Sequence, residues 1–182
     1  MAKLGMFISN GCEEVEALTV VDLARRAGFT LDMIQIQNEE RAKGSHGITF
    51  ETEKKVSETD FSVYDGVILP GGLPGTNYLK ESAEVKDTVK KFAGEGKLVA
   101  AICAAPTALG LFGVLEGKKA TCYPGLEKDL TGAEAKADEV VRDGNIITSR
   151  GVGTAIPFAL AIIEYFDGEE KAREIGKSIV YG

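Results

Sequence analysis

The sequence predicts an α/β fold, with one mostly parallel β-sheet and helices packed on both of its faces. Strand-length apolar segments alternate with helix-length segments along the chain, as in consecutive β-α units. Two of the strand-length segments, Val67–Leu69 and Leu98–Ile102, are continuous apolar runs, as strands of a buried parallel sheet are. No repeat, low-complexity run or long Pro/Gly linker divides the 182 residues, so we expect a single domain over residues 1–182.

The N-terminal part of the chain begins with a strand, a helix and a second strand. We expect the strands at Lys3–Ser9 and Thr30–Gln35. The helix between them covers about Glu13–Ala27 and ends at Gly28, which suits the left-handed position after a helix. A polar-apolar stretch near Ile48–Val56 is expected to form an edge hairpin.

The middle of the chain holds two buried strands, each followed by a loop and a helix. Val67–Leu69 leads into the loop Pro70–Gly75, and a helix follows at about Ala83–Glu95. The strand Leu98–Ile102 leads through Cys103 into a helix with Pro106 in its first turn, a position that proline favours.

The C-terminal part is predicted to form a hairpin and two helices. Strands at Val140–Arg142 and Asn145–Thr148 flank Asp143-Gly144, a strong hairpin signal. Thr154–Phe166 has aliphatic residues nearly all round and predicts a well-buried helix. A last helix is expected at about Glu169–Lys177.

Composition and charge exclude several classes of function. The net charge of −7 and the lack of a basic cluster argue against a nucleic-acid-binding role. Neither a signal-type apolar segment nor a membrane span is present. Three cysteines without paired spacing suggest free thiols in a reducing compartment, so we expect a cytoplasmic protein. No Walker A or dinucleotide-binding glycine pattern occurs, and we expect no cofactor.

Cys103 is the strongest candidate for chemistry. It lies at a sharp strand-to-helix turn, which resembles a nucleophile elbow above the carboxyl edge of a sheet. Free N–H groups and the positive end of a helix there favour a thiolate. This context alone leaves a small buried cysteine equally possible.

Three loops follow strands at the same predicted edge of the sheet and could converge: Asn10–Glu16, Pro70–Gly75 and Cys103–Pro106. The Gly72 and Ala104 N–H groups could form an oxyanion hole, although a Gly-Gly turn is often only a turn. Glu16 could hydrogen-bond the Cys103 sulfur if burial keeps its carboxyl protonated. The helix dipole alone also explains the acidic residues Glu13 and Glu14 at the start of the same helix.

The single histidine, His46, argues against one class of enzyme but does not itself point to a function. His46 lies 57 residues before Cys103 in a glycine-rich loop, and no histidine follows the cysteine, so a Cys-His hydrolase is disfavoured. A solvated loop residue is the simpler interpretation of His46. Cys12 and Cys122 lack metal-ligand spacing, and we expect no metal. Cys12 could approach Cys103, but neither cysteine is a strong candidate for a resolving thiol.

Five segments together resemble the ThiJ/PfpI superfamily, and most closely its parkinsonism-associated deglycase branch. They occur in family order, at family spacing, over nearly the whole chain: Gly11–Glu16, Arg25–Gly28, Leu69–Gly72, Ala101–Pro106 and Thr148–Thr154. The resemblance implies a flavodoxin-like three-layer sandwich that forms homodimers. It also implies that Cys103 is an oxidisable nucleophile and Glu16 its protonated partner, with Gly72 and Ala104 donating backbone N–H groups.

The same resemblance implies a wider pocket around the sulfur, lined by Glu13 and Gly71. His46 occupies a position where the family often has arginine, and we expect His46 and Arg26 to approach the pocket from the partner subunit. Two further pocket positions depart from the family pattern. Tyr123 replaces a histidine found in many relatives, and Val152 replaces a usual proline.

Three functions follow from the resemblance. The first is a cofactor-independent enzyme that acts on methylglyoxal, glyoxal or early glycation adducts of proteins or nucleotides through a Cys103 hemithioacetal. The second is a redox-sensing protein with holdase-like chaperone activity that depends on oxidation of Cys103. The third is a structural relative without activity, for which Tyr123 is the best argument. Ala104 stands where the protease branch has histidine, which argues against proteolysis.

Overall fold

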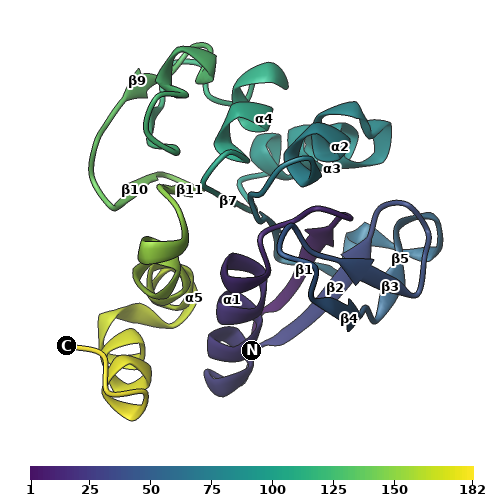
Figure 1. The fold of residues 1–182 in the computed structure, drawn as a ribbon. Coiled ribbons are helices and arrows are strands. Elements are labelled where there is room, and N and C mark those ends of the chain that lie inside the picture. Colours follow the sequence, from purple (N-terminus) through teal and green to yellow (C-terminus); the bar gives the residue numbers. More distant parts are fainter.

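The computed structural model describes residues 1–182 as a seven-stranded sheet with helices on both faces (Figure 1). The strand order is β10-β11-β7-β6-β1-β2-β5, and all neighbours are parallel except the β10–β11 pair. The strands are β1 (Lys3–Ile8), β2 (Thr30–Gln35), β5 (Lys54–Lys55), β6 (Gly66–Leu69), β7 (Leu98–Ile102), β10 (Val140–Asp143) and β11 (Ile146–Ser149).

Two helical layers cover the sheet. Helices α1 (Glu14–Arg26) and α5 (Ala155–Ser178) pack on one face, and α2 (Gly75–Glu81), α3 (Ala83–Gly94) and α4 (Pro106–Leu111) pack on the other (Figure 1). Residues of a strand alternate between the two layers, so that Met6 packs with α1 and α5 whereas Phe7 packs with α3. These findings confirm the predicted α/β, flavodoxin-like class. No helix is both long enough and apolar enough to cross a membrane.

The predicted helix boundaries agree with the structure at two glycines. Gly28 follows α1 with φ +90°, the left-handed conformation expected after a helix. Gly168, with φ +85°, interrupts α5 between the two segments that the sequence predicted as separate helices.

The predicted hairpin within Ile48–Val56 is wrong. β4 (Thr49–Glu51) pairs with the earlier β3 (Arg41–Lys43) in a separate two-stranded sheet, and β5 instead adds to the edge of the main sheet beside β2. Glu53 explains the switch between the sheets. Its backbone N–H donates to the Met33 carbonyl at 3.1 Å, and its carboxylate accepts the Met33 N–H at 2.9 Å.

The second hairpin exists, with its turn one residue later than predicted. Asp143 pairs with Ile146, which leaves Gly144-Asn145 as the turn, and Gly144 has φ +63°. The Asp143 carboxylate accepts the Lys119 N–H at 2.9 Å, which holds Asp143 within the strand. Short elements escaped prediction because they span too few residues for a periodic pattern: α2, β8 (Lys119–Ala120) and β9 (Glu134–Ala135).

Candidate active site

The backbone at Cys103 forms a sharp turn between β7 and α4. Cys103 has φ +64°, a conformation that costs energy in residues other than glycine. Its N–H donates to the Ser149 carbonyl at 3.0 Å, and its own carbonyl accepts the Tyr123 N–H at 2.8 Å. Two hydrogen bonds therefore stabilise the strained residue at the carboxyl edge of the sheet.

The three loops predicted to converge do so around Cys103. The Glu13 N–H donates to the Gly71 carbonyl at 2.9 Å, and the Gly75 N–H donates to the Gly11 carbonyl at 3.1 Å. These bonds join the loop after β1 to the loop after β6. Both loops contribute residues to cavities that Cys103 also lines.

Glu16 lies on the first turn of α1 and is fully buried. Its Oε2 accepts the Gly71 N–H at 2.9 Å, whereas its Oε1 has no hydrogen-bond partner. Burial raises the pKa of Glu16 to about 7, even though the Gly71 N–H and the Cys103 thiol both lower it. A carboxyl group that holds its proton near neutral pH is what the sequence analysis expected here.

The Cys103 thiol shows a shift opposite to the expected one. Burial, followed by the neighbouring Glu16 carboxylate, raises the pKa of Cys103 to about 12. The backbone N–H groups of Ala104 and Gly72 lower it, but by less. The helix N-terminus was expected to favour a thiolate; α4 is only six residues long, and its effect does not outweigh burial beside a carboxylate.

Cys103 and Glu16 therefore function as one titrating pair. Burial raises the pKa of Glu16, and burial beside the Glu16 carboxylate raises the pKa of Cys103, so the two groups compete for a proton. A thiolate forms when the sulfur transfers its proton to Glu16. The backbone N–H groups of Gly72 and Ala104 lower the pKa of Cys103, and their role as an oxyanion hole stays a prediction.

Gly71 and Gly72 allow this close approach. A Cβ atom on Gly71 would lie 2.6 Å from the Cys103 Cβ and 2.8 Å from Glu16 Oε2. A Cβ atom on Gly72, which has φ +90°, would collide with the Glu13 backbone nitrogen. The Gly-Gly sequence is thus required by packing as well as by its donor groups.

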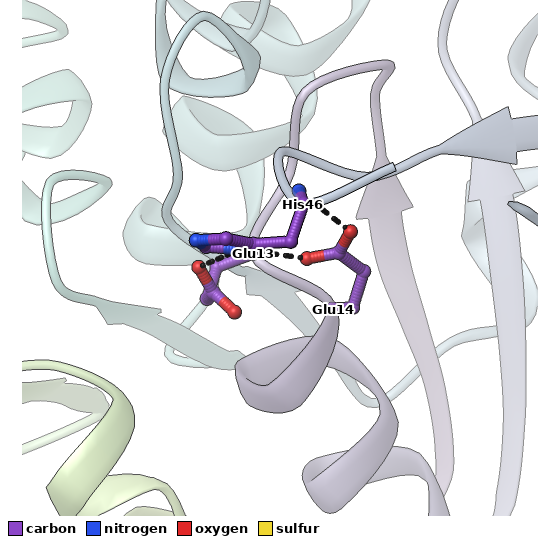
Figure 2. Close-up of side chains that lie close together, drawn as sticks. All are labelled: Glu13, Glu14 and His46. Carbon is purple, nitrogen blue, oxygen red and sulfur yellow. Dashed lines mark hydrogen bonds and ion pairs between the residues drawn. The ribbon is translucent and has the colours of Figure 1, made fainter. Parts of the chain in front are cut away.

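His46 lies between two buried carboxylates of its own chain, as Figure 2 shows. Its Nδ1 is 3.2 Å from an oxygen of Glu13 and 3.2 Å from an oxygen of Glu14. Burial acts against ionisation of Glu14, but hydrogen bonds from its own N–H and from the His46 and Ile48 N–H groups lower its pKa overall. Glu14 therefore anchors the His46 loop as a carboxylate.

The resemblance implied that His46 reaches the pocket from the partner subunit. That role stays a prediction, and the structure places His46 near Cys103 of its own chain as well. His46 lines a cavity of about 550 Å³ together with Cys103 and Ala104 of the same chain. Its side chain remains 70% exposed, in keeping with the loop position. Arg26 lies elsewhere, pairing with Asp22 at 2.6 Å on the surface of α1, so only a partner chain could bring it to a pocket.

Glu13, Glu14 and His46 could also hold a metal ion, since each offers one ligand atom within 4.8 Å of the others. Both carboxylates already accept hydrogen bonds from the His46 loop, including bonds from the Ser45 hydroxyl at 3.2 and 3.5 Å. A proton on His46 Nδ1 accounts for the arrangement without an ion. The absence of a metal remains a prediction.

A second cavity of about 670 Å³ also has Cys103 in its wall and shares part of its lining with the first. Glu13, Gly72 and Tyr123 line both cavities, and Glu16 and Val152 line the larger one. Two charged residues that sequence analysis did not assign to the site also line the larger cavity: Glu139 and Arg150. Arg150 lies two residues after the predicted strand end at Thr148 and within the family segment Thr148–Thr154, which is the signal that could have identified it.

The other two cysteines are free thiols in buried positions. Burial raises the pKa of Cys12 to about 12 and that of Cys122 to about 11. Neither lines a cavity with Cys103. This arrangement gives no support to a resolving role for either residue.

Comparison with known proteins assigns the family. Residues 2–165 match the model of the DJ-1/PfpI family. The chain belongs to the DJ-1/PfpI family. It is 38% identical over 177 residues to Protein dj-1beta of Drosophila melanogaster, covering 96% of this chain and 95% of that protein. It is also 41% identical over 175 residues to Protein DJ-1 homolog B of Arabidopsis thaliana, covering 95% of this chain but only 40% of that relative's length.

Two further DJ-1/PfpI proteins bear on fold and activity. The structure of oxidized Toxoplasma gondii DJ-1 superposes with a TM-score of 0.96 at 32% identity, and each chain is covered completely. The glutathione-independent glyoxalase DJR-1.2 of Caenorhabditis elegans is 31% identical over 169 residues, which cover 92% of this chain and 89% of that protein. The family thus includes a glyoxalase similar to this chain over most of its length.

Proposed function

We propose that this DJ-1/PfpI protein is a glutathione-independent glyoxalase that converts methylglyoxal or glyoxal to the corresponding hydroxy acid. One observation supports this most strongly: the Cys103 thiol neighbours a buried carboxyl, Glu16, beside two backbone N–H donors and at the wall of a cavity. A nucleophile, a proton carrier and an oxyanion hole are the components that the reaction needs.

The reaction begins when Cys103 transfers its proton to Glu16 and the sulfur bonds to the aldehyde carbon, C1. The C1 oxygen takes up the negative charge, receives hydrogen bonds from the Gly72 and Ala104 N–H groups, and gains the proton from Glu16. The product is a hemithioacetal, and Glu16 is again a carboxylate. A pKa of about 7 suits a group that must both release and accept a proton near neutral pH.

The second stage moves a proton between two carbons. Glu16 removes the C1 proton, the electron pair forms a C1–C2 double bond, and the C2 carbonyl becomes an enediolate oxygen. Glu16 returns its proton to C2, the C1 hydroxyl proton passes to the C2 oxygen, and C1 becomes the carbonyl of a thioester on Cys103. Water hydrolyses this thioester to lactate, or glycolate from glyoxal, and regenerates the thiol; no external oxidant or reductant is needed.

Purified protein tests this proposal when it is incubated with methylglyoxal without glutathione and lactate is measured. We expect lactate from the wild type and none above background from Cys103→Ser or Glu16→Gln. Cys122→Ser is the matched control, because Cys122 is buried outside both cavities. Lactate production by Cys103→Ser at the wild-type rate would refute the mechanism.

The same chemistry extends to early adducts of these aldehydes on proteins or nucleotides. The two cavities that Cys103 lines, of about 670 and 550 Å³, leave room for a substrate larger than methylglyoxal. Deglycase activity is supported only if adduct loss exceeds what removal of free aldehyde explains. A trapping thiol that consumes free aldehyde provides this control, and activity that disappears with the trap counts against a deglycase.

A homodimer is part of the same proposal. Arg26 reaches a pocket only in a second copy, since its own chain places it on the outer surface of α1. Sedimentation equilibrium tests the oligomeric state, and a protein that stays monomeric at high concentration excludes a partner role for Arg26. We also propose that the chain acts in the cytoplasm, and imaging of a tagged protein in its own cells would test this location.

Oxidation sensing, with holdase-like chaperone activity, is a second candidate function. Cys103 is half-buried at the wall of two cavities, whereas Cys12 and Cys122 are buried. Glu16 Oε1 lacks a partner, and a protonated Glu16 could donate a hydrogen bond to a sulfinate at Cys103. Intact-mass analysis after mild peroxide treatment should show the gain of two oxygens, and peptide mapping should locate them on Cys103. A holdase assay should then show less client aggregation with the oxidised protein than with the reduced one; no change would remove this candidate.

A further inference from the structure

The glyoxalase mechanism requires donors for two substrate oxygens, and the residues considered so far serve only one. Gly72 and Ala104 direct their N–H groups to the sulfur and hence to the oxygen on C1. Negative charge then develops on the C2 oxygen when Glu16 removes the C1 proton. An enzyme that accelerates this step needs a preorganised donor at that second oxygen.

We propose that Arg150 is this second donor: its guanidinium hydrogen-bonds the C2 oxygen of the α-oxoaldehyde and stabilises the enediolate. The inference rests on the proposed glyoxalase function and deepens it. Arg150 is the only lysine or arginine that lines either cavity beside Cys103.

The sheet register places Arg150 beside Cys103. Strands β7 and β11 are parallel neighbours, and Ile102 is aligned with Ser149. The next residues along the two strands are Cys103 and Arg150, so both leave the same edge of the sheet on adjacent strands, which lie about 4.8 Å apart. The hydrogen bond from the Cys103 N–H to the Ser149 carbonyl, at 3.0 Å, fixes this relation.

The Arg150 backbone is held rigidly. The Thr154 hydroxyl oxygen accepts the Arg150 N–H at 3.2 Å and the Gly151 N–H at 3.1 Å, and it lies 2.7 Å from the Ser149 hydroxyl. One guanidinium nitrogen, Nη1, donates to the Ala137 carbonyl at 2.7 Å, and Ala137 lines the same cavity. The side chain is therefore oriented before substrate binds.

Most of the guanidinium remains free for a ligand. An arginine carries five N–H donors, and Arg150 uses one nitrogen for its only side-chain hydrogen bond. No carboxylate lies within ion-pair distance of it, although Glu13, Glu16 and Glu139 line the same cavity. A permanent positive charge without a paired carboxylate suits a developing oxyanion.

His46 is the competing donor, because its ring lies at the wall of the smaller cavity. Its Nδ1 already contacts Glu13 and Glu14, and these carboxylates attract any positive charge that the ring holds. Arg150 has no such partner and is always protonated. The two residues therefore give different predictions on substitution.

Kinetics with methylglyoxal tests the proposal. We expect Arg150→Gln to lower kcat for lactate formation about 100-fold, the usual effect of removing one oxyanion donor, with Arg150→Lys in between. Guanidinium chloride at non-denaturing concentration should partly rescue Arg150→Gln, and urea should not. Arg142→Gln is the matched control, because Arg142 packs over the Tyr165 ring and lines neither cavity.

A binding measurement separates this role from a structural one. In the Glu16→Gln background the C1 proton is not removed, so the hemithioacetal, formed with solvent in place of Glu16 as the proton carrier, accumulates without turnover. Arg150→Gln should weaken the equilibrium formation of this Cys103 adduct with methylglyoxal about 10-fold, the effect of one hydrogen bond to a charged group. It should leave the adduct with propionaldehyde unchanged, because that aldehyde has no C2 oxygen. Equal weakening of both adducts would show a structural role and overturn the proposal.

The remaining outcomes are also decisive. Wild-type kcat in Arg150→Gln, or a comparable loss only in His46→Gln, would refute the role of Arg150 while leaving the glyoxalase function intact. Absence of lactate from the wild type would refute the glyoxalase function and the enediolate role together. Lactate from the wild type, lost in Arg150→Gln and rescued by guanidinium, would support both.

Discussion

Replacing Glu16 with glutamine should stabilise the protein at alkaline pH while abolishing its activity. Burial raises the pKa of Glu16 from 4.5 to about 7, so the folded state must hold a buried charge above that pH. At about 1.36 kcal/mol per pKa unit, this rise corresponds to roughly 3 kcal/mol. The glutamine side chain keeps an acceptor for the Gly71 N–H, which donates to Glu16 Oε2 at 2.9 Å.

The sign of this effect depends on pH. Because the folded pKa lies above the unfolded value, the unfolded chain loses the proton first, and stability falls as pH rises from 4.5 to about 7. The stability difference between Glu16→Gln and wild type should therefore grow by roughly 2–3 kcal/mol from about pH 5 to about pH 8.5.

Denaturant unfolding at these two pH values measures the difference. Glu58→Gln is the control, because Glu58 is exposed and the same substitution there should leave the pH dependence unchanged. A Glu16→Gln variant whose stability relative to wild type does not change with pH would contradict the reasoning. So would one that is less stable than wild type at alkaline pH.

Three further predictions follow from the site. Lactate formation from methylglyoxal should rise with pH through about 7, because Glu16 must be a carboxylate to accept the Cys103 proton. A rate that falls through this range would count against the titration of Cys103 and Glu16 as a pair. Gly72→Ala should lower kcat by about 100-fold and stability by roughly 1–3 kcal/mol, measured by kinetics and thermal unfolding, because the new Cβ would strain a φ of +90° and move a donor N–H. Gly94→Ala, which has open space around its new Cβ and lines neither cavity, should leave kcat unchanged. Peroxide should oxidise Cys103 before Cys12 or Cys122, as peptide mass mapping would show. Oxidation of Cys12 or Cys122 before Cys103 would contradict the proposal that Cys103 is the redox-sensitive thiol.

Local sequence patterns predicted the parts of the fold that depend on one segment at a time. Continuous apolar strands, Gly28 after the first helix and the break at Gly168 all follow from the chemistry of a few neighbouring residues. The edge hairpin was wrong because the partner of β4 is the earlier strand β3, and Glu53 then redirects the chain to β2. No local pattern encodes that choice of partner.

In the candidate site, too, features that depend on one segment could be predicted, and features that depend on contacts between distant segments could not. The strand-to-helix position of Cys103 and the burial of Glu16 could be anticipated, because each depends on one turn and one helix face. The raised pKa of Cys103 could not, since it results from burial beside a carboxylate contributed by another element. The place of His46 in its own chain's cavity likewise depends on a loop held by Glu14.

Lactate formed from methylglyoxal without glutathione is the most direct test of the central claim. We predict that the wild type forms lactate and that Cys103→Ser, in which the sulfur is replaced at the same position, forms none above background. Absence of lactate from the wild type would contradict the glyoxalase function, and lactate at the wild-type rate from Cys103→Ser would contradict the role of the thiol.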